Sequence, residues 1–180
     1  RWQIIAVLLP RSTAMKLYIC VPGCTFTSRF RNPLNERRGL LTVLITGGHG
    51  HLGAWIAQHL ARAGQRSILF DLNPVQPDQL TPVSDRIEYV RGDVLDFPRL
   101  ADTIRGRDID GIVHTVGVMG EMVLDNPHHN VRLNIEGTHN VLELARQFAV
   151  PKVVYTGTGA VYSAGSVSAT EDSPTAPADL

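Results

Sequence analysis

The residues best suited to chemistry form a glycine-rich stretch, Thr-Gly-Gly-His-Gly-His-Leu-Gly, at positions 46–53. It follows an apolar run and opens a segment with helical periodicity, the order that builds a cradle for a dinucleotide. Gly47 permits a tight turn, Gly50 lets the backbone approach a pyrophosphate, and Gly53 allows the new helix to pack on the strand. The amides and positive end of that helix would face the phosphates. We therefore expect cofactor contacts from Gly47, Gly48, His49, Gly50, His51, Leu52 and Gly53.

Acidic residues close the next two expected strands. Asp71 comes eighteen residues after Gly53, where a carboxylate accepts both ribose hydroxyls of an adenosine. It also repels a 2′-phosphate, and the residues after it bring no Lys or Arg, so the sequence favours NAD over NADP. Asp93, with the adjoining Val94, is placed to meet the adenine amino group. A solvated turn residue is the alternative at Asp71, and a turn- or helix-initiating residue is the alternative at Asp93.

The fourth expected strand ends in His114, Thr115 and Val116, where small residues let backbone come close to the middle of the cofactor. We expect all three to contact it. For His114, the alternative is a packed or capping histidine without a chemical role.

Three further polar residues follow later in the chain. Asn134 lies in the middle of an expected helix, where asparagine is unfavourable, so it either bonds to buried backbone near the cofactor or faces solvent. Thr156 and Thr158 lie at and just after the end of the fifth strand, and we expect Thr156 to contact the cofactor. Thr158 is the candidate for orienting a substrate hydroxyl or carbonyl, and a hydroxyl-stabilised turn is the alternative.

No metal site is expected. His49 and His51 have a spacing that suits a metal ion, but both lie in the turn needed for phosphate and no third ligand is evident. Cys20 and Cys24 both lie in the N-terminal segment and have no ligand context around them.

These residues need a sheet to position them, and the sequence alternates strand and helix. We expect strands at 41–46, 66–71, 87–91, 111–116 and 152–156, helices at 54–63, 98–105 and 129–148, and a proline-bearing loop at 73–84. Short apolar strands separated by helices predict an α/β fold. It is a Rossmann-like doubly wound parallel sheet, incomplete at its carboxyl end.

The first forty residues differ from the rest. They carry seven Lys or Arg against one acid, whereas 41–180 carry ten against sixteen. A transit peptide or a secretory signal is an open alternative, but we expect residues 1–40 to be an extension that is disordered or not part of the domain at 41–180. That domain is mildly acidic, which argues against nucleic acid. No apolar run approaches the ~20 residues of a membrane span, so we expect a cytoplasmic protein without a membrane partner.

Taken in order, the motifs resemble the extended short-chain dehydrogenase/reductase superfamily, in its NAD-dependent epimerase/dehydratase branch, which includes UDP-glucose 4-epimerase-like enzymes. The match covers about 41–180 and rests on Thr46-Gly-Gly-x-Gly-x-x-Gly53, Asp71, Gly92-Asp93-Val94, His114-x-x-Gly117, Asn134-x-x-Gly-Thr-x-Asn140 and Thr156-x-Thr-x-Ala-Val-Tyr162. The resemblance implies bound NAD, a nucleotide-sugar substrate and transient hydride transfer through a keto intermediate. It places Thr158 at the substrate-orienting position of the family. It also makes a homodimer a candidate assembly.

The sequence departs from the family pattern in two places. His51 stands where the family usually has Phe, which should alter packing more than phosphate binding. The catalytic Tyr-x-x-x-Lys is absent, because neither Lys16 nor Lys152 stands four residues after a tyrosine. In that mechanism the tyrosine transfers the hydroxyl proton and the lysine lowers its pKa. We therefore expect a cofactor-binding part that stops short of its base and binds NAD without turnover. The alternative is a non-enzymatic dinucleotide-binding or redox-sensing protein of the same fold.

Overall fold

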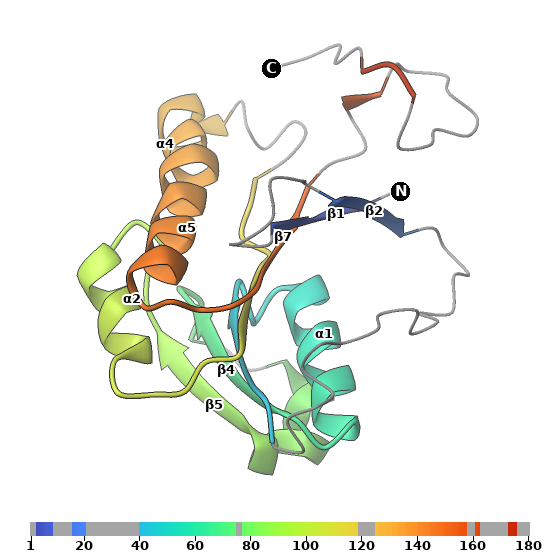
Figure 1. Ribbon diagram of the computed structural model, residues 1–180, viewed down its shortest axis with the longest axis vertical. Coiled ribbons are helices and arrows are strands. Elements are labelled where there is room, and N and C mark those ends of the chain that lie inside the picture. The colour runs from blue at the N-terminus through green and yellow to red at the C-terminus, as the bar shows by residue number, and fades with distance from the viewer. Residues whose placement is uncertain are drawn as a thin grey trace. The chain divides into compact units, whose positions relative to one another are not determined.

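The computed structural model describes residues 3–8, 16–20, 40–74, 77–118, 125–157, 161–162 and 173–175 (Figure 1). The chain forms two compact units. The larger is Leu40–Val153, and the smaller combines Arg1–Gly39 with Val154–Leu180.

The larger unit is built on parallel strands in the order β6, β3, β4, β5. Their bounds are β3 (Thr42–Thr46), β4 (Arg66–Asp71), β5 (Ile87–Arg91) and β6 (Gly111–His114). The amide of Ile112 donates to Lys152 O at 2.9 Å, and Lys152 directly precedes a fifth strand, β7 (Val153–Thr156). The five predicted strands are confirmed. The strand order reverses at β3, and such a switch point creates a ligand crevice at the carboxyl ends of the strands.

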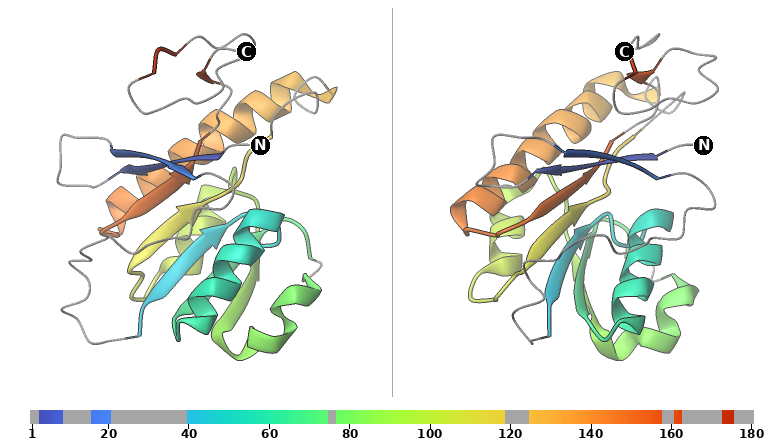
Figure 2. Two further views of the ribbon diagram at one scale, coloured as in Figure 1. Left: turned by 90° about the vertical axis from the view of Figure 1, so that its right-hand side faces the viewer. Right: turned by 45° about the vertical axis from the view of Figure 1, so that its right-hand side comes forward.

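Helices cover both faces of this sheet, as the two views of Figure 2 show for α1 on one side and α2 and α5 on the other. The helical segments are α1 (His51–Arg62), η2 (Asp78–Arg86), α2 (Phe97–Ile104), α4 (Pro127–Arg132), η3 (Leu133–Gly137) and α5 (Thr138–Gln147). Asp96 caps α2 by accepting a hydrogen bond from the amide of Arg99 at 3.0 Å, with Pro98 in the first turn. Asn126 caps α4 in the same way from His129.

Several details differ from the sequence expectation. Strand β6 ends at His114 rather than at residue 116. Helix α1 begins at His51 rather than at residue 54, because Gly50 has extended backbone angles and serves as its N-cap. The proline-bearing segment 78–86 forms 3₁₀ turns, which Val83 interrupts with a φ of −127°, because such short turns tolerate Pro82. The long helix predicted at 129–148 contains the π-helical turn η3, which inserts an extra residue into the helical ladder.

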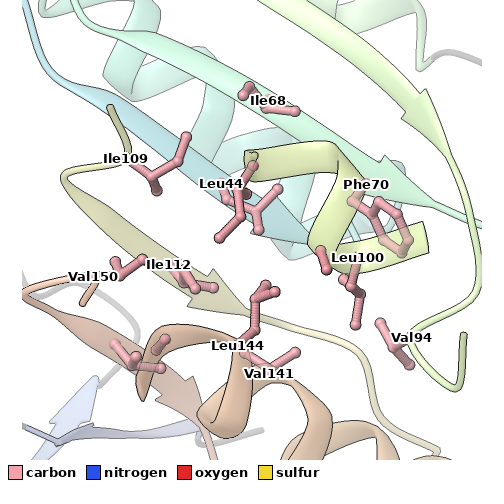
Figure 3. Packing of buried hydrophobic residues seen from close by; sticks show 14 residues of the cluster. Leu44, Ile68, Phe70, Val94, Leu100, Ile109, Ile112, Val141, Leu144 and Val150 are labelled. Carbon is pink, nitrogen blue, oxygen red and sulfur yellow. The ribbon is translucent and has the colours of Figure 1, made fainter. Parts of the chain in front are cut away.

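Alternate residues of β3 and β4 enter opposite cores. Leu44, Ile68 and Phe70 pack with Leu100 of α2 and Leu144 of α5, and Figure 3 shows these side chains converging. The second core lies under α1 and contains Ile45, Ala54, Ala57, Leu69, Leu80 and Ile87. Two buried faces on one parallel sheet define the doubly wound fold that the sequence predicts.

The smaller unit contains an antiparallel pair of strands, β1 (Gln3–Leu8) and β2 (Lys16–Cys20), in which Gln3 pairs with Cys20. It also contains a single antiparallel bridge between Tyr162 and Thr175. The sequence did not predict these strands, and the assignment of residues 1–40 to an extension outside the domain stays a prediction. Among the described residues, no helix has both the length and the apolarity to cross a membrane.

Candidate functional site

A crevice of about 280 Å³ lies at the carboxyl ends of β3, β4, β5 and β6, where the strand order reverses. Its lining consists of Gly47, Gly50, Phe70, Asp71, Leu72, Gly92, Asp93, Val94, Thr115, Val116, Gly117, His129 and Leu133. Among these residues, two carry carboxylates and none is a lysine or arginine. The crevice therefore favours hydroxyl and amine donors over a bare anion near its acidic end.

The glycine turn leaves no room for side chains. Gly47 has a φ of +76°, and a Cβ there would stand 2.7 Å from Thr115 Oγ1. A Cβ on Gly48 would stand 2.6 Å from the Cβ of Leu69. A Cβ on Gly53 would stand 2.2 Å from Gly47 O. These glycines are therefore required by the close packing of turn, helix and strand.

The amides of this turn divide into two groups. Those of Gly47 and Gly48 donate to Phe70 O, at 2.9 and 3.5 Å, and that of Gly50 donates to Gly47 O at 3.1 Å. The amide of His49 donates to Asp71 Oδ2 at 2.9 Å.

The second group belongs to the first turn of α1. The amides of His51, Leu52 and Gly53 have no intrahelical acceptor, because the helix begins at His51. Gly50 offers no side-chain cap. In the part of the chain that the structure describes, no backbone group outside the helix accepts from these three amides, which makes them candidates for binding a phosphate.

Asp71 lies at the end of β4 with each carboxylate oxygen already accepting one backbone amide. Oδ2 accepts from His49, and Oδ1 accepts from Asn73 at 2.8 Å. The second contact is the Asx turn that the sequence offered as the alternative role. A carboxylate has about four lone-pair positions, so Asp71 keeps capacity for two more donors while its orientation is fixed.

Asp93 also combines a turn with a place in the crevice. Its Oδ1 accepts from the amide of Leu95 at 2.9 Å, and no described residue donates to Oδ2. The next residue, Val94, is buried, and its carbonyl accepts from Asn140 Nδ2 at 2.9 Å. Gly137 is needed here, because a Cβ on it would come within 2.9 Å of Val94 Cγ2.

Thr115 holds the glycine turn from the β6 side. Its hydroxyl donates to Thr46 O at 2.8 Å and reaches Gly47 O at 3.2 Å, and its amide donates to Thr46 O at 3.0 Å. The threonine therefore shapes the crevice as well as lining it.

Asn134 lies in η3 and pairs with both backbone groups of Val118. Its Oδ1 accepts from Val118 N and its Nδ2 donates to Val118 O, both at 2.9 Å. The bond to backbone that the sequence suggested is therefore present. The side chain lies outside the crevice lining and fixes the segment that follows β6, whose residues 115–117 line the crevice.

His114 is buried, with 1% of its surface exposed, and it lies outside the crevice lining. Nδ1 lies 2.6 Å from Thr46 Oγ1, and Nε2 lies 3.2 Å from Thr138 Oγ1. Burial lowers the pKa of His114 to about 4, so the ring is neutral at neutral pH. The structure thus supports the packed role, with no direct path to a ligand in the crevice.

The imidazoles at 49 and 51 leave the crevice open. His49 Nδ1 lies 2.5 Å from Asn73 O, and the ring packs on Tyr89 with 5.4 Å between ring centroids. Burial raises the pKa of Tyr89. His51 is an exposed residue of the first helical turn. The described residues contain no group of three or more His, Cys, Asp or Glu side chains that could hold a metal ion.

The crevice brings together seven of the predicted residues, namely Gly47, Gly50, Asp71, Asp93, Val94, Thr115 and Val116. The crevice lining does not include the other seven, and their roles in cofactor binding stay predictions: Gly48, His49, His51, Leu52, Gly53, His114 and Asn134. Thr156 ends β7 in the smaller unit, so its role stays a prediction. Thr158 lies outside the described residues.

Sequence reasoning missed several lining residues as site members. Gly92 is one, and a Cβ on it would stand 2.2 Å from Cζ of Phe70, which shows that the ring of Phe70 crosses above the end of β5. Its place in the Gly92-Asp93 pair was a usable signal. His129 and Leu133 come from α4 and η3, far along the chain, and no local pattern marks them.

Comparison with known proteins identifies the family of this chain. The model of the NAD dependent epimerase/dehydratase family matches residues 43–179. Short-chain dehydrogenase/reductase family 42E member 1 of Xenopus laevis is 33% identical over 126 residues, which cover 69% of this chain and 31% of the relative. UDP-glucose 4-epimerase of Streptomyces lividans is 32% identical over 138 residues, which cover 74% of this chain and 41% of the relative. The chain thus spans less than half the length of these relatives.

Solved structures show the same fold. UDP-glucose 4-epimerase from Bifidobacterium longum, in complex with NAD⁺ and UDP, superposes with a TM-score of 0.68 and 22% identity over 75% of this chain and 42% of that one. The Bordetella bronchiseptica enzyme WbmG, in complex with NAD, has a TM-score of 0.67 and 26% identity over 78% of this chain and 45% of that one. The family model covers most of the sequence, and the relatives agree with it. The chain therefore belongs to the NAD-dependent epimerase/dehydratase family of extended short-chain dehydrogenases/reductases.

Proposed function

We propose that the crevice at the carboxyl ends of β3, β4 and β6 binds NAD. The amides of His51, Leu52 and Gly53 would hold the diphosphate at the positive end of α1. Asp71 would accept the hydroxyls of the adenosine ribose. One observation carries the proposal: three open amides begin a helix next to a carboxylate that the same turn holds in place.

The remaining lining residues extend this assignment. The free Oδ2 of Asp93 would accept from the adenine amino group, and Val116 and Gly117 would leave room for the middle of the dinucleotide. Leu72 is 60% exposed at the rim, which suits a contact with the flat face of a base. The crevice thus offers acceptors where adenosine has donors and backbone donors where the phosphates would lie.

We further propose a nucleotide sugar as the substrate of the whole protein, as the names of the relatives suggest. Bound NAD supplies the hydride acceptor in this family. Thr158 remains the proposed substrate-orienting residue. The 180 residues contain no tyrosine followed four positions later by lysine, so this chain lacks the phenol–ammonium pair that moves the hydroxyl proton. The chain by itself would therefore bind NAD without turnover.

A homodimer is the proposed assembly. Val131 and Ile135 lie about one helical turn apart, in α4 and η3, and are 50% and 67% exposed. Exposed apolar side chains at this spacing suit a helix–helix contact. Sedimentation of the chain with both residues changed to Ser should give a monomer where the unchanged chain gives a dimer. A monomeric unchanged chain would contradict the assembly.

Calorimetric titration with NAD tests the cofactor proposal. We expect a single saturable site, weakened about ten- to hundredfold by Asp71→Asn, the range expected for hydrogen bonds to a charged group. Asp85→Asn is a matched control, since it removes an exposed carboxylate whose contact is Arg86 at 3.9 Å. No saturable binding to the unchanged chain, or an equal loss in both variants, would reject the proposal.

A further inference from the structure

His114 is a buried residue whose two ring nitrogens both have partners on other elements. Nδ1 faces the hydroxyl of Thr46 at the end of β3, and Nε2 faces the hydroxyl of Thr138 at the start of α5. It ends β6, directly before Thr115, and it is 1% exposed. The packed role explains its burial but not why two hydroxyls converge on it.

The hydrogen bonds fix which nitrogen carries the proton. Thr138 has one hydroxyl proton, and it donates that proton to Asn134 O at 2.6 Å. The hydroxyl oxygen must therefore accept from Nε2–H of His114. Nδ1 is then the unprotonated nitrogen, and it accepts the hydroxyl proton of Thr46. Each of the three side chains has a single consistent role.

These hydrogen bonds hold the start of the glycine turn. Thr46 is the last residue of β3 and directly precedes Gly47, whose φ of +76° begins the turn. His114 holds the Thr46 side chain, and Thr115 holds the Thr46 and Gly47 carbonyls. The last residue of β6 and the residue after it therefore hold two consecutive residues at the start of the turn. A change in the backbone angles of Thr46 would therefore move the amides of the glycine turn and of the helix start.

We propose that His114 is a positioning residue for the cofactor: by accepting the Thr46 hydroxyl proton through Nδ1 it fixes the turn whose amides bind the diphosphate. This inference rests on the proposed function, because it assigns a role in NAD binding. The bond to Thr138 supports this role, since it holds the ring in the tautomer in which Nδ1 is an acceptor.

Two variants of His114 separate these bonds. The Oδ1 of asparagine replaces the acceptor Nδ1, so His114→Asn keeps the contact with Thr46 and loses that with Thr138. The longer glutamine side chain reaches the place of Nε2, so His114→Gln keeps the contact with Thr138 and loses that with Thr46. Thr46→Val and Thr138→Val remove the same two contacts from the other side.

Calorimetry with NAD and thermal unfolding of each full chain give the test. We expect His114→Gln and Thr46→Val to weaken NAD binding by about tenfold or more, and His114→Asn and Thr138→Val to weaken it by less than about threefold. All four variants should lower the Tm. If His114 had only a structural role, the loss of NAD affinity would parallel the loss of Tm across the four variants. That result would overturn the inference. If the unchanged chain fails to bind NAD, the proposed function itself fails, which is a separate outcome.

Discussion

Gly53 lies against Gly47 so closely that a Cβ at position 53 would stand 2.2 Å from the carbonyl oxygen of Gly47. The obstacle is backbone, which cannot rotate away as a side chain can. The contact joins the first turn of α1 to the start of the glycine turn, so the two move together.

Gly53→Ala should therefore displace α1 from the turn, abolish measurable NAD binding and destabilise the fold by roughly 1–3 kcal/mol, as overpacking does. Gly111→Ala is the matched control, because a Cβ there would lie 3.5 Å from Lys152 O, an ordinary contact. Urea unfolding and NAD titration of both variants check this. Unchanged affinity in Gly53→Ala would show that the turn is not the binding element.

Asp71 should determine the choice between NAD and NADP. Its carboxylate is held by two amides at the place proposed for the ribose, and no lysine or arginine lines the crevice. We expect the unchanged chain to bind NAD more tightly than NADP, and Asp71→Asn to narrow the ratio of the two Kd values by about tenfold, since it removes the repulsion of a 2′-phosphate. Parallel titrations with both dinucleotides measure the ratio. Tighter binding of NADP by the unchanged chain would contradict the assignment.

Asn134 should contribute stability through Val118. Asn134→Ala removes both 2.9 Å bonds and leaves the Val118 amide and carbonyl without these partners, which should cost roughly 1–3 kcal/mol. Asn134→Asp keeps an acceptor for the amide and places a carboxylate beside the carbonyl, so at neutral pH it should rescue little. Chemical denaturation of the three proteins gives the comparison. Equal stability of all three would show that the segment after β6 is held by other contacts.

His114 should make stability depend on pH. Its folded pKa of about 4 lies below the ordinary 6.5, so the unfolded chain binds a proton at a pH where the folded chain does not. Stability is then fully present above pH 6.5 and is lost as pH falls toward 4, by at most about 3 kcal/mol. Urea unfolding at pH 5 and 7 should show this loss in the unchanged chain, and His114→Asn should reduce it. An equal pH dependence in both proteins would assign the effect to other groups.

Much of the fold could be predicted from local sequence patterns. The apolar runs and their separation were enough to place β3, β4 and β5 within a residue of their observed bounds, and Asp96 with Pro98 marked the start of α2. Such signals depend on neighbouring residues. The 3₁₀ turns at 78–86 were not predicted, because prolines in general disfavour regular structure, although they are compatible with short turns.

The site was less predictable because its details are nonlocal. Asp71 and Asp93 can be found from their places at strand ends, but nothing near His114 in the sequence shows that hydroxyls from residues 46 and 138 meet its ring. The same holds for Leu133, which lines the crevice although it lies in η3, far along the chain from the glycine turn. Contacts between distant segments fix these roles, and a single sequence does not display them.

The amides of residues 47–53 fall into those that hold the loop in shape and those that begin α1. The loop is held by hydrogen bonds from its own amides to Phe70 O, Asp71 and Gly47 O. None of these bonds uses the amides of residues 51–53 at the start of the helix. An arriving dinucleotide would thus meet a preorganised receptor and lose little conformational entropy of the protein on docking. Amide hydrogen exchange should show the turn protected to the same degree before and after saturation, with new protection confined to residues 51–53.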